Sequence, residues 1–214
     1  VLQDIAFLVF DRHVQGGHAT TYLVTGHELE KKKALAVAFA KALNCAGATT
    51  RAGCACDVCR KIGSGVHPDV KWYGLDEEAS SIKIEEIRDF KNWLSLKPFQ
   101  ARVKVFIFNR AERLTTEAQN ALLKSLEEPP VGNVILLLVP DRSTLFDTIA
   151  SRAMELKVPP FRMEEIQDLL RREGLPEEEI RFLARVSRGQ LRCARSAHEA
   201  DWFGRRNSWM GELA

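Results

Sequence analysis

Short apolar runs alternate with longer amphipathic segments over the first 160 residues of the chain. The runs RVKVFIFN (102–109) and NVILLLV (133–139) become continuously apolar, which is typical of strands buried on both faces of a parallel sheet. Three more short runs also have the composition of strands: 20–25, 69–74 and 154–158. The pattern therefore predicts five strands separated by other elements.

The segments between these runs repeat their apolar residues with the period of an α-helix. Leu35, Phe39 and Leu43 share one stripe of the first such segment. Thr116 is the predicted N-cap of a later one, which two prolines end. The predicted helices cover 28–43, 81–96, 115–128 and 144–151. Strands alternating with helices predict an α/β fold whose parallel sheet is covered on both faces.

The pattern changes at VPPF (158–161), after which all periodic segments are helical. They cover 162–174, 176–189 and 190–203. We therefore predict an α/β domain over 1–160 and a separate small helical domain over 161–208, joined by a short proline linker.

Composition narrows the class of protein. Apolar residues make up 45% and charged residues 28% of the 214 residues, which indicates a globular protein. Basic and acidic side chains nearly balance, 31 against 29, so the overall charge does not indicate a nucleic-acid binder. The apolar runs are too short to span a bilayer, and the printed sequence shows no signal-peptide pattern. We expect a cytoplasmic protein.

The stretch TGHELEKKK (25–33) lies between the first strand and the first helix, where nucleotide-binding α/β domains have a phosphate loop. Gly26 and Lys32 match the first glycine and the lysine of the pattern G-x-x-x-x-G-K-[ST]. Lys31 replaces the second glycine, and Lys33 replaces the hydroxyl residue that holds magnesium. The alternative is an ordinary strand-to-helix loop followed by a helix with a solvated lysine face.

The strand 102–109 ends in Asn109 and Arg110. In nucleotide-hydrolysing α/β domains the corresponding strand ends in acidic residues that act near magnesium and orient the attacking water. Neither residue here has a carboxylate, and arginine does not act as a base at any accessible pH. The phosphate loop and the strand end therefore both lack residues needed for hydrolysis.

Four of the five cysteines lie within fifteen residues, with the spacing C-x8-C-x-C-x2-C: Cys45, Cys54, Cys56 and Cys59. Four thiolates are typical of a structural zinc site, which has no open position for catalysis. In a cytosolic chain such a cluster favours a metal over disulfides. Unmetallated thiols and a disulfide pair are the alternatives. Cys193 lies alone, and we have no function for it.

Arginines form two further patterns. Arg152 follows Ser151 beside the last strand, where an arginine can stabilise transferring phosphate on a neighbouring subunit or form an ordinary surface ion pair. Five more arginines follow in steps of four and three residues: Arg181, Arg185, Arg188, Arg192 and Arg195. They predict either contact with phosphate or a solvated face paired with the glutamates 177–179. Gly189 is expected to break this helical face.

Three of these features together resemble one family. NALLKSLEEPP (120–130), the cysteine cluster after the first helix and TIASR (148–152) are similar to bacterial clamp-loader subunits of the AAA+ class, which belong to the DNA polymerase III holoenzyme. The likeness extends from about residue 21 to about residue 194. It implies an AAA+ nucleotide-binding-type domain with a zinc module at about 45–60, followed by a three-helix lid. A ring-assembly domain would follow near residue 205, and we expect it to be absent here. The family usually has two residues between each of its last three cysteines, whereas one residue separates Cys54 from Cys56.

Two kinds of subunit share this plan. Motor subunits (gamma and tau) hydrolyse ATP, whereas delta-prime subunits often have a degraded phosphate loop and serve as stators. The residues at the loop and strand end, together with Val139 and Pro140 in place of a polar sensor, favour a stator that binds no ATP. By motif, Arg152 corresponds to the arginine finger that reaches a neighbour's ATP, and Arg192 in GQLR corresponds to the sensor arginine of the lid.

The resemblance also implies partners. These are the motor subunits and the delta subunit, with the sliding clamp and primer-template DNA reached through the assembly. It implies no membrane contact, and we expect this chain to be monomeric alone. One alternative is an ATP-binding gamma/tau-like motor subunit, because Lys32 survives. Another is a free-standing DNA-binding module that uses the arginine series.

Overall fold

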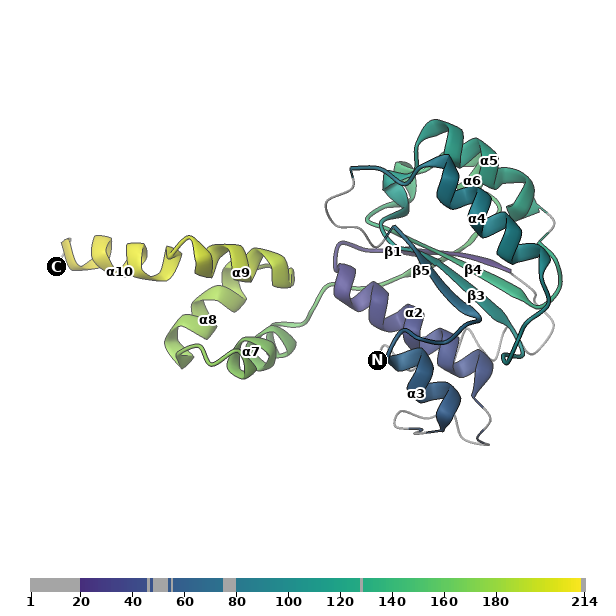
Figure 1. The fold of residues 1–214 in the computed structure, drawn as a ribbon. Helices are drawn as coiled ribbons and strands as arrows, with labels where there is room; N and C mark the ends of the chain where they lie inside the picture. Colours follow the sequence, from purple (N-terminus) through teal and green to yellow (C-terminus); the bar gives the residue numbers. More distant parts are fainter. Residues whose placement is uncertain are drawn as a thin grey trace. The chain divides into compact units, whose positions relative to one another are not determined.

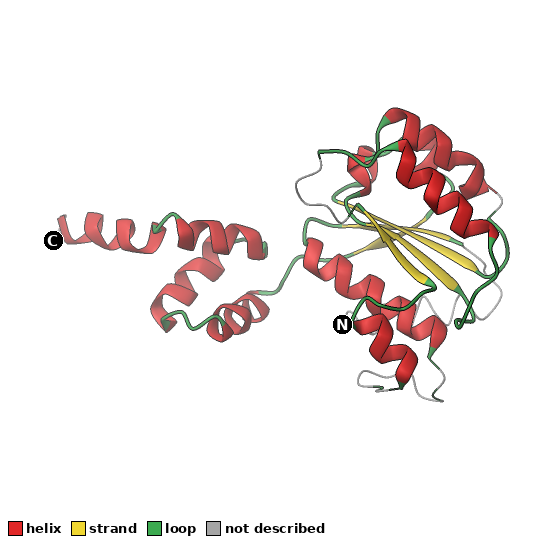
Figure 2. Cartoon of the chain, in the orientation of Figure 1, coloured by secondary structure: helices red, strands yellow, loops and turns green. Residues whose placement is uncertain are grey.

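The computed structural model describes residues 20–45, 47, 54, 56–74, 80–127 and 129–212, with side chains described as far as residue 209. The chain divides into two compact units between Val158 and Pro159. The first unit is an α/β structure and the second is helical (Figure 2). None of the helices that the structure describes combines the length and the apolar character needed to cross a membrane.

A sheet of five parallel strands forms the centre of the first unit, in the spatial order β2-β3-β4-β1-β5. Its strands are β1 (Thr21–Thr25), β2 (Val70–Tyr73), β3 (Lys104–Phe108), β4 (Asn133–Val139) and β5 (Met154–Lys157). β3 and β4 are buried along their whole length, as their continuous apolar runs predict. The predicted parallel α/β fold is confirmed.

Helices cover both faces of this sheet (Figure 1). One face packs against α2 (Leu29–Asn44) and α3 (Asp57–Gly63), and the other against α4 (Ile84–Ser95), α5 (Thr116–Glu127) and the short α6 (Asp147–Ala150). Two 3-10 turns, η1 (Ala111–Arg113) and η2 (Arg142–Thr144), follow β3 and β4. Side chains alternate between the faces along each strand, so the sheet separates two apolar cores.

The predicted helix faces are largely correct, with one corrected cap. Leu35, Phe39 and Leu43 are buried on α2, as their spacing predicts. The N-cap of α5 is Thr115 and not Thr116, because the Thr115 hydroxyl accepts the Ala118 N–H at 3.2 Å. Either threonine satisfies the sequence pattern, and this hydrogen bond decides between them.

Two buried polar side chains hold the segment that leads into β3. The Asp69 carboxylate accepts the backbone N–H groups of Phe99, Gln100 and Ala101 at 2.7–2.8 Å. The Asn44 carbonyl oxygen accepts the next two N–H groups, of residues 102 and 103, both at 3.0 Å. Five consecutive backbone donors are therefore satisfied by side chains distant in sequence.

The second unit contains α7 (Met163–Arg172), α8 (Glu177–Val186), α9 (Leu191–Glu199) and α10 (Trp202–Glu212). Its core forms from Ile166, Leu170, Ile180, Leu183 and the apolar face of α9. The predicted helix 190–203 is wrong as one element, because α9 ends before Asp201, whose φ of 51° is left-handed. This residue separates α9 from α10.

Candidate functional site

Three residues connect β1 to α2, where the sequence suggests a phosphate loop. Gly26 has a φ of 142°, and its N–H donates to the carbonyl of Pro140 at 3.1 Å. A Cβ added to Gly26 would lie 2.5 Å from the carbonyl oxygen of Val158. Glycine is therefore required here by the close approach of the backbone beyond β4 and β5.

Helix α2 begins inside the loop motif. Its first residue is Leu29, so Lys31 is helical and buried rather than part of an open turn. The Lys32 N–H donates to the carbonyl of Glu28 at 3.1 Å, which is a helical hydrogen bond. A phosphate loop needs backbone N–H groups free to curl around the anion, and the helix uses part of that backbone instead.

The Lys32 ammonium lies among protein groups at the carboxyl end of the sheet. Its Nζ atom donates to the carbonyl oxygen of Val139 at 2.7 Å, and the residue is 3% exposed. Burial lowers the pKa of Lys32 to about 8. The negative charges of Glu112 and Glu28 oppose this lowering, whereas the charge of Arg110 adds to it.

The strand end beside Lys32 is tied to β2. The Asn109 Nδ2 atom donates to the carbonyl of Gly74 at 3.0 Å, and the Asn109 N–H donates to that of Tyr73 at 2.9 Å. The Asn109 Oδ1 atom is buried with no hydrogen-bond partner among the described residues. Arg110 turns the chain with a left-handed φ of 53°. These two side chains give the strand end no carboxylate for magnesium or water.

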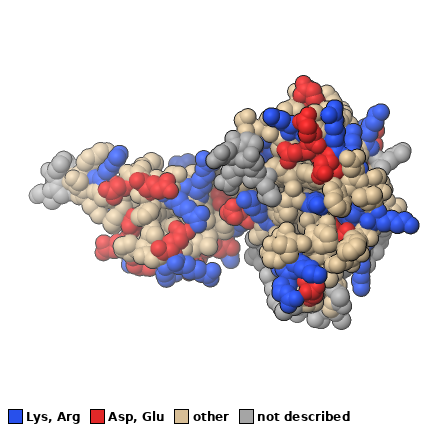
Figure 3. All heavy atoms as spheres, in the orientation of Figure 1, with Lys and Arg blue, Asp and Glu red and all other residues tan. Residues whose placement is uncertain are grey.

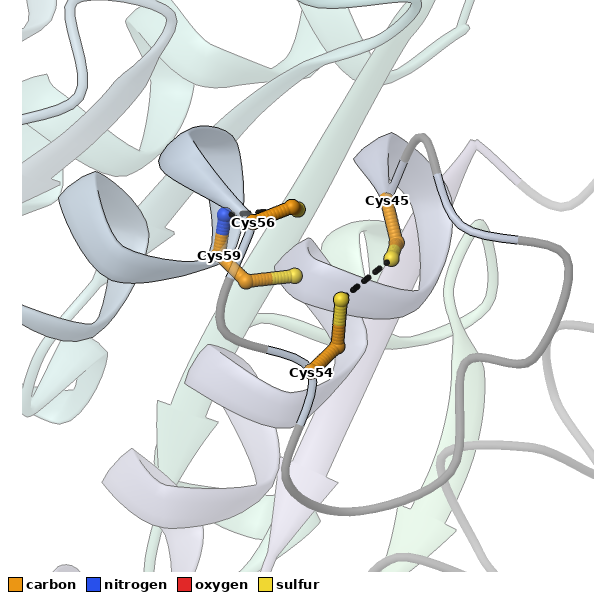
Figure 4. A group of neighbouring side chains, drawn as sticks. All are labelled: Cys45, Cys54, Cys56 and Cys59. Atoms are coloured by element: carbon orange, nitrogen blue, oxygen red, sulfur yellow. Dashed lines mark hydrogen bonds between the residues drawn. The ribbon is translucent and has the colours of Figure 1, made fainter.

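The four clustered cysteines converge on one point (Figure 4). Their Sγ atoms all lie within 4.8 Å of one another. Four sulfurs around a tetrahedral zinc, with bonds of about 2.3 Å, are separated by about 3.8 Å, so the cluster has the right size. The residue types and their separations therefore fit a closed metal site, as predicted. The rest of the predicted module, residues 46, 48–53 and 55, lies outside the described residues.

Local backbone positions these sulfurs. Cys45 is the C-cap of α2, and Cys56 is the N-cap of α3. The Gly47 N–H donates to the Cys45 Sγ at 3.4 Å, and the Cys59 N–H donates to the Cys56 Sγ at 3.5 Å. N–H donors stabilise thiolates, which are the form that binds metal. The single residue between Cys54 and Cys56 does not prevent convergence.

The surroundings of Cys59 disfavour ionisation of its thiol. Burial raises the pKa of the Cys59 thiol above its ordinary value, and the hydrogen bonds that this thiol donates to the sulfurs of Cys56 and Cys45 add to the shift because they favour the protonated form. All four cysteines are free thiols, and the sulfurs of Cys45 and Cys54 are 3.4 Å apart, well beyond a disulfide bond of about 2.05 Å. A cation would offset the repulsion among four thiolates, so the donor set fits zinc.

Arg152 lies just after α6, at the edge of the first unit. Its Nη2 atom forms a 2.8 Å ion pair with Glu127 at the end of α5, and its Nη1 atom donates to the carbonyl of Thr148 at 2.8 Å. The side chain is 37% exposed. The ordinary ion-pair interpretation is thus realised in the isolated chain, and the guanidinium still reaches solvent.

The arginine series does not form one helical face. α8 ends at Val186, and Arg188 and Gly189 both have left-handed φ, so the series is divided between α8 and α9. Gly189 breaks the face as predicted. The predicted pairing of the series with the glutamates 177–179 is not among the ion pairs that the structure describes. Glu177 pairs with Arg171, and Arg195 pairs with Glu173.

Arg192 lies exposed in the first turn of α9. On the face shown in Figure 3, basic and acidic side chains are interspersed rather than segregated by sign. This distribution agrees with the near-balance of charge in the sequence. It offers little support for a free-standing DNA-binding module.

A family model described as DNA polymerase III, delta subunit, matches residues 3–162. The chain belongs to this family. DNA polymerase III subunit tau of Escherichia coli is 34% identical over 182 residues, which are 82% of this chain and 28% of that protein. Subunit delta' of Pseudomonas aeruginosa is 33% identical over 163 residues, 75% of this chain and 49% of the relative. The chain therefore spans less than half the length of these two relatives.

The fold agrees with this family. A solved DNA polymerase III gamma-subunit-related protein from Thermotoga maritima matches with a TM-score of 0.61 and 25% identity. The match covers 89% of this chain and 57% of the solved one. The AAA+ α/β architecture expected of clamp-loader subunits is therefore confirmed.

Sequence reasoning did not find three contacts at these sites. They are the bond from Lys32 to Val139, the ion pair of Arg152 with Glu127, and the Asn44 bridge beside Cys45. Each joins residues far apart in sequence, so no local spacing predicts it. Glu127 lies within the motif LEEPP. This motif indicates a functional segment, but it does not indicate that Glu127 pairs with Arg152.

Proposed function

We propose that this protein is a non-hydrolysing stator subunit of the bacterial clamp loader, in the manner of delta-prime. The main support is that the residues at the expected phosphate loop already bind to other parts of the chain. Helix α2 starts at Leu29, and the Lys32 ammonium is bound to the chain's own Val139 carbonyl. A nucleotide would have to displace that contact and unwind the first helical turn before the backbone could cradle a phosphate.

Two further features support the absence of hydrolysis. Asn109 and Arg110 give no carboxylate at the strand end, so neither magnesium nor an attacking water has its usual ligand there. Val139 offers no polar side chain as a sensor at the end of β4. On this proposal the second unit is a lid, and Arg192 is a sensor-like arginine that has lost its nucleotide.

The positive role that we propose lies at Arg152. An exposed arginine after α6 can reach the γ-phosphate of ATP on an adjacent motor subunit, where such fingers contribute about 10³-fold or more to hydrolysis in other systems. Its ion pair with Glu127 is exposed, and exposed pairs contribute about 0–1 kcal/mol, so the guanidinium is readily redirected. The partners proposed are gamma or tau and delta, with the sliding clamp and DNA reached through the assembly.

We also propose a structural zinc ion held by Cys45, Cys54, Cys56 and Cys59. The ion would neutralise the thiolates and close the module on its four ligands. A site filled by four protein ligands leaves no position for substrate, so its role is to hold α2 and α3 together.

Equilibrium titration with a fluorescent ATP analogue and magnesium tests the stator assignment. We expect no saturable, magnesium-dependent binding by this chain. A purified tau subunit serves as the positive control. A variant with Lys31→Gly and Lys33→Thr restores the phosphate-loop pattern. Its affinity for the analogue shows how far these two residues alone account for the loss of ATP binding. Micromolar, magnesium-dependent affinity of the unmodified chain would favour the alternative, a gamma/tau-like motor subunit, to which the surviving Lys32 and the identity with tau are specific pointers.

The role in trans is tested in a reconstituted loader. Arg152→Ala should lower ATP hydrolysis by the motor subunits and clamp loading by at least about tenfold, because one transition-state cation is lost. Arg142→Ala, which removes an exposed arginine from η2, is the matched control. Unchanged hydrolysis with Arg152→Ala contradicts the role in trans and leaves the binding result standing.

A further inference from the structure

Helix α5 holds the segment before Arg152 at two points. In its first turn, the buried Gln119 accepts the Phe146 N–H on Oε1 at 3.0 Å, just before α6 begins. At its last residue, Glu127 contacts the guanidinium of Arg152 at 2.8 Å. The α6 segment is therefore fastened to one helix at its start and at its end.

The guanidinium of Arg152 has contacts on two of its nitrogens. Glu127 contacts Nη2, and the Thr148 carbonyl accepts from Nη1 at 2.8 Å. The Ser151 hydroxyl donates to the same carbonyl at 3.2 Å, so the two residues of the SR pair share one acceptor. Two of the five N–H donors that arginine carries make these contacts within the described chain.

We propose that Glu127 is a positioning residue for Arg152, an inference that rests on the proposed role in trans. An arginine side chain loses considerable rotamer freedom when it binds a phosphate. A carboxylate that already restricts the side chain reduces the rotamer entropy that is lost at the transition state. The other N–H donors of the guanidinium remain available to bind phosphate. Because the pair is exposed, it guides the guanidinium without trapping it.

The test measures ATP hydrolysis by a clamp loader reconstituted with this protein and its motor subunits. Glu127→Gln should lower kcat about three- to fivefold with little change in KM, because ATP binds on the neighbouring subunit. Glu127→Asp should recover part of the loss. Raising the salt concentration should reduce the difference between Glu127→Gln and the unmodified protein, since the ion pair is screened. Glu117→Gln, at the other end of the same helix, is the control.

A double-mutant cycle separates positioning from a structural effect. In the Arg152→Ala background, Glu127→Gln should have no further effect on kcat. An equal loss in both backgrounds, an increase in kcat, or an unchanged kcat with Glu127→Gln alone would overturn the inference. If Arg152→Ala itself has no effect, the proposed role in trans fails first. If only the glutamate variants are silent, that role stands and the positioning role is wrong.

Discussion

The Nζ atom of Lys32 lies 2.7 Å from the carbonyl oxygen of Val139, so the first turn of α2 is bonded to the end of β4. In a working phosphate loop this ammonium would neutralise a bound anion. Here a backbone carbonyl is its acceptor, and the carboxylates of Glu28 and Glu112 supply nearby negative charge. The chain's own groups thus supply the acceptor and the negative charge that a bound nucleotide would supply to this ammonium.

This relationship predicts a pH dependence of stability. The folded pKa of Lys32 is about 8, below the ordinary value of 10.5, so the unfolded chain binds more protons between these pH values. The contribution of Lys32 should therefore increase as pH rises from about 8 to 10.5, by up to about 3 kcal/mol. Urea unfolding at pH 7.5 and pH 9.5 measures the change, and Lys32→Met should remove it. An identical pH slope in Lys32→Met would contradict the prediction.

The thiol cluster predicts about one zinc per purified chain. Removing the metal with a chelator should destabilise the first unit by more than about 4 kcal/mol, because the free energy of metal binding is lost. Cys59→Ser should lower the zinc content in the same way, since Cys59 is a buried member of the cluster. Elemental analysis and thermal unfolding are the measurements. Cys193→Ser changes an exposed thiol and should alter neither; a full loss of zinc in that variant would argue against this ligand set.

Asp69 predicts a stability loss at low pH. Burial acts to raise the pKa of its carboxyl, but the three backbone N–H donors outweigh burial and hold the pKa below its ordinary value. The stabilisation is present above the unfolded pKa of about 4 and is lost as pH falls through the folded pKa.

Asp69→Asn should cost about 2–3 kcal/mol at pH 7, because the amide replaces one acceptor oxygen with an NH2 group that faces a backbone N–H, which then lacks its acceptor. Chemical denaturation at pH 7 and pH 3 measures both effects. Asp141→Asn, an exposed residue that also accepts a backbone N–H, should have a much smaller effect. Equal losses in the two variants would show that burial of the Asp69 cluster is unimportant.

Gly26 and Gly174 separate backbone strain from crowding. Both have φ in the range that favours glycine, but a Cβ at Gly26 meets the Val158 carbonyl at 2.5 Å, whereas one at Gly174 meets nothing within 4 Å. Gly174→Ala should cost about 1 kcal/mol, and Gly26→Ala about 3 kcal/mol or more. Thermal unfolding compares them. Similar losses would mean that glycine is required at position 26 for its backbone conformation alone.

Local pattern predicts the five strands, most of the helices and the cluster of sulfurs. The period of Leu35, Phe39 and Leu43 decides the buried face of α2, and the short spacing of the four cysteines brings their sulfurs together. The division near residue 160 follows from a change of period at two prolines. In each case the information lies within a few turns of the chain.

The remaining features depend on contacts between distant residues. The phosphate-loop pattern predicts that Lys31 lies in a loop, whereas the periodicity of the same stretch predicts that it lies in a helix. Packing of α2 on the sheet favours the helix, which the structure shows. Lys104 is charged, yet it is buried because its ammonium caps the carbonyl end of α4. Helical periodicity therefore predicts the state of Lys31 only as one of two patterns, and no spacing in the sequence predicts the burial of Lys104.

Helix α2 is 16 residues long, about 24 Å, with Gly26 to Glu28 entering it and Cys45 capping it. Lys32 bonds its first turn to β4, and Asn44 bonds its last residue to the start of β3. Hydrogen bonds thus hold the helix at both ends, and a metal bound at Cys45 would add a second contact at its C-terminal end. If the protein acts as the proposed stator, we expect these contacts to keep α2 in place on the sheet while neighbouring subunits hydrolyse ATP.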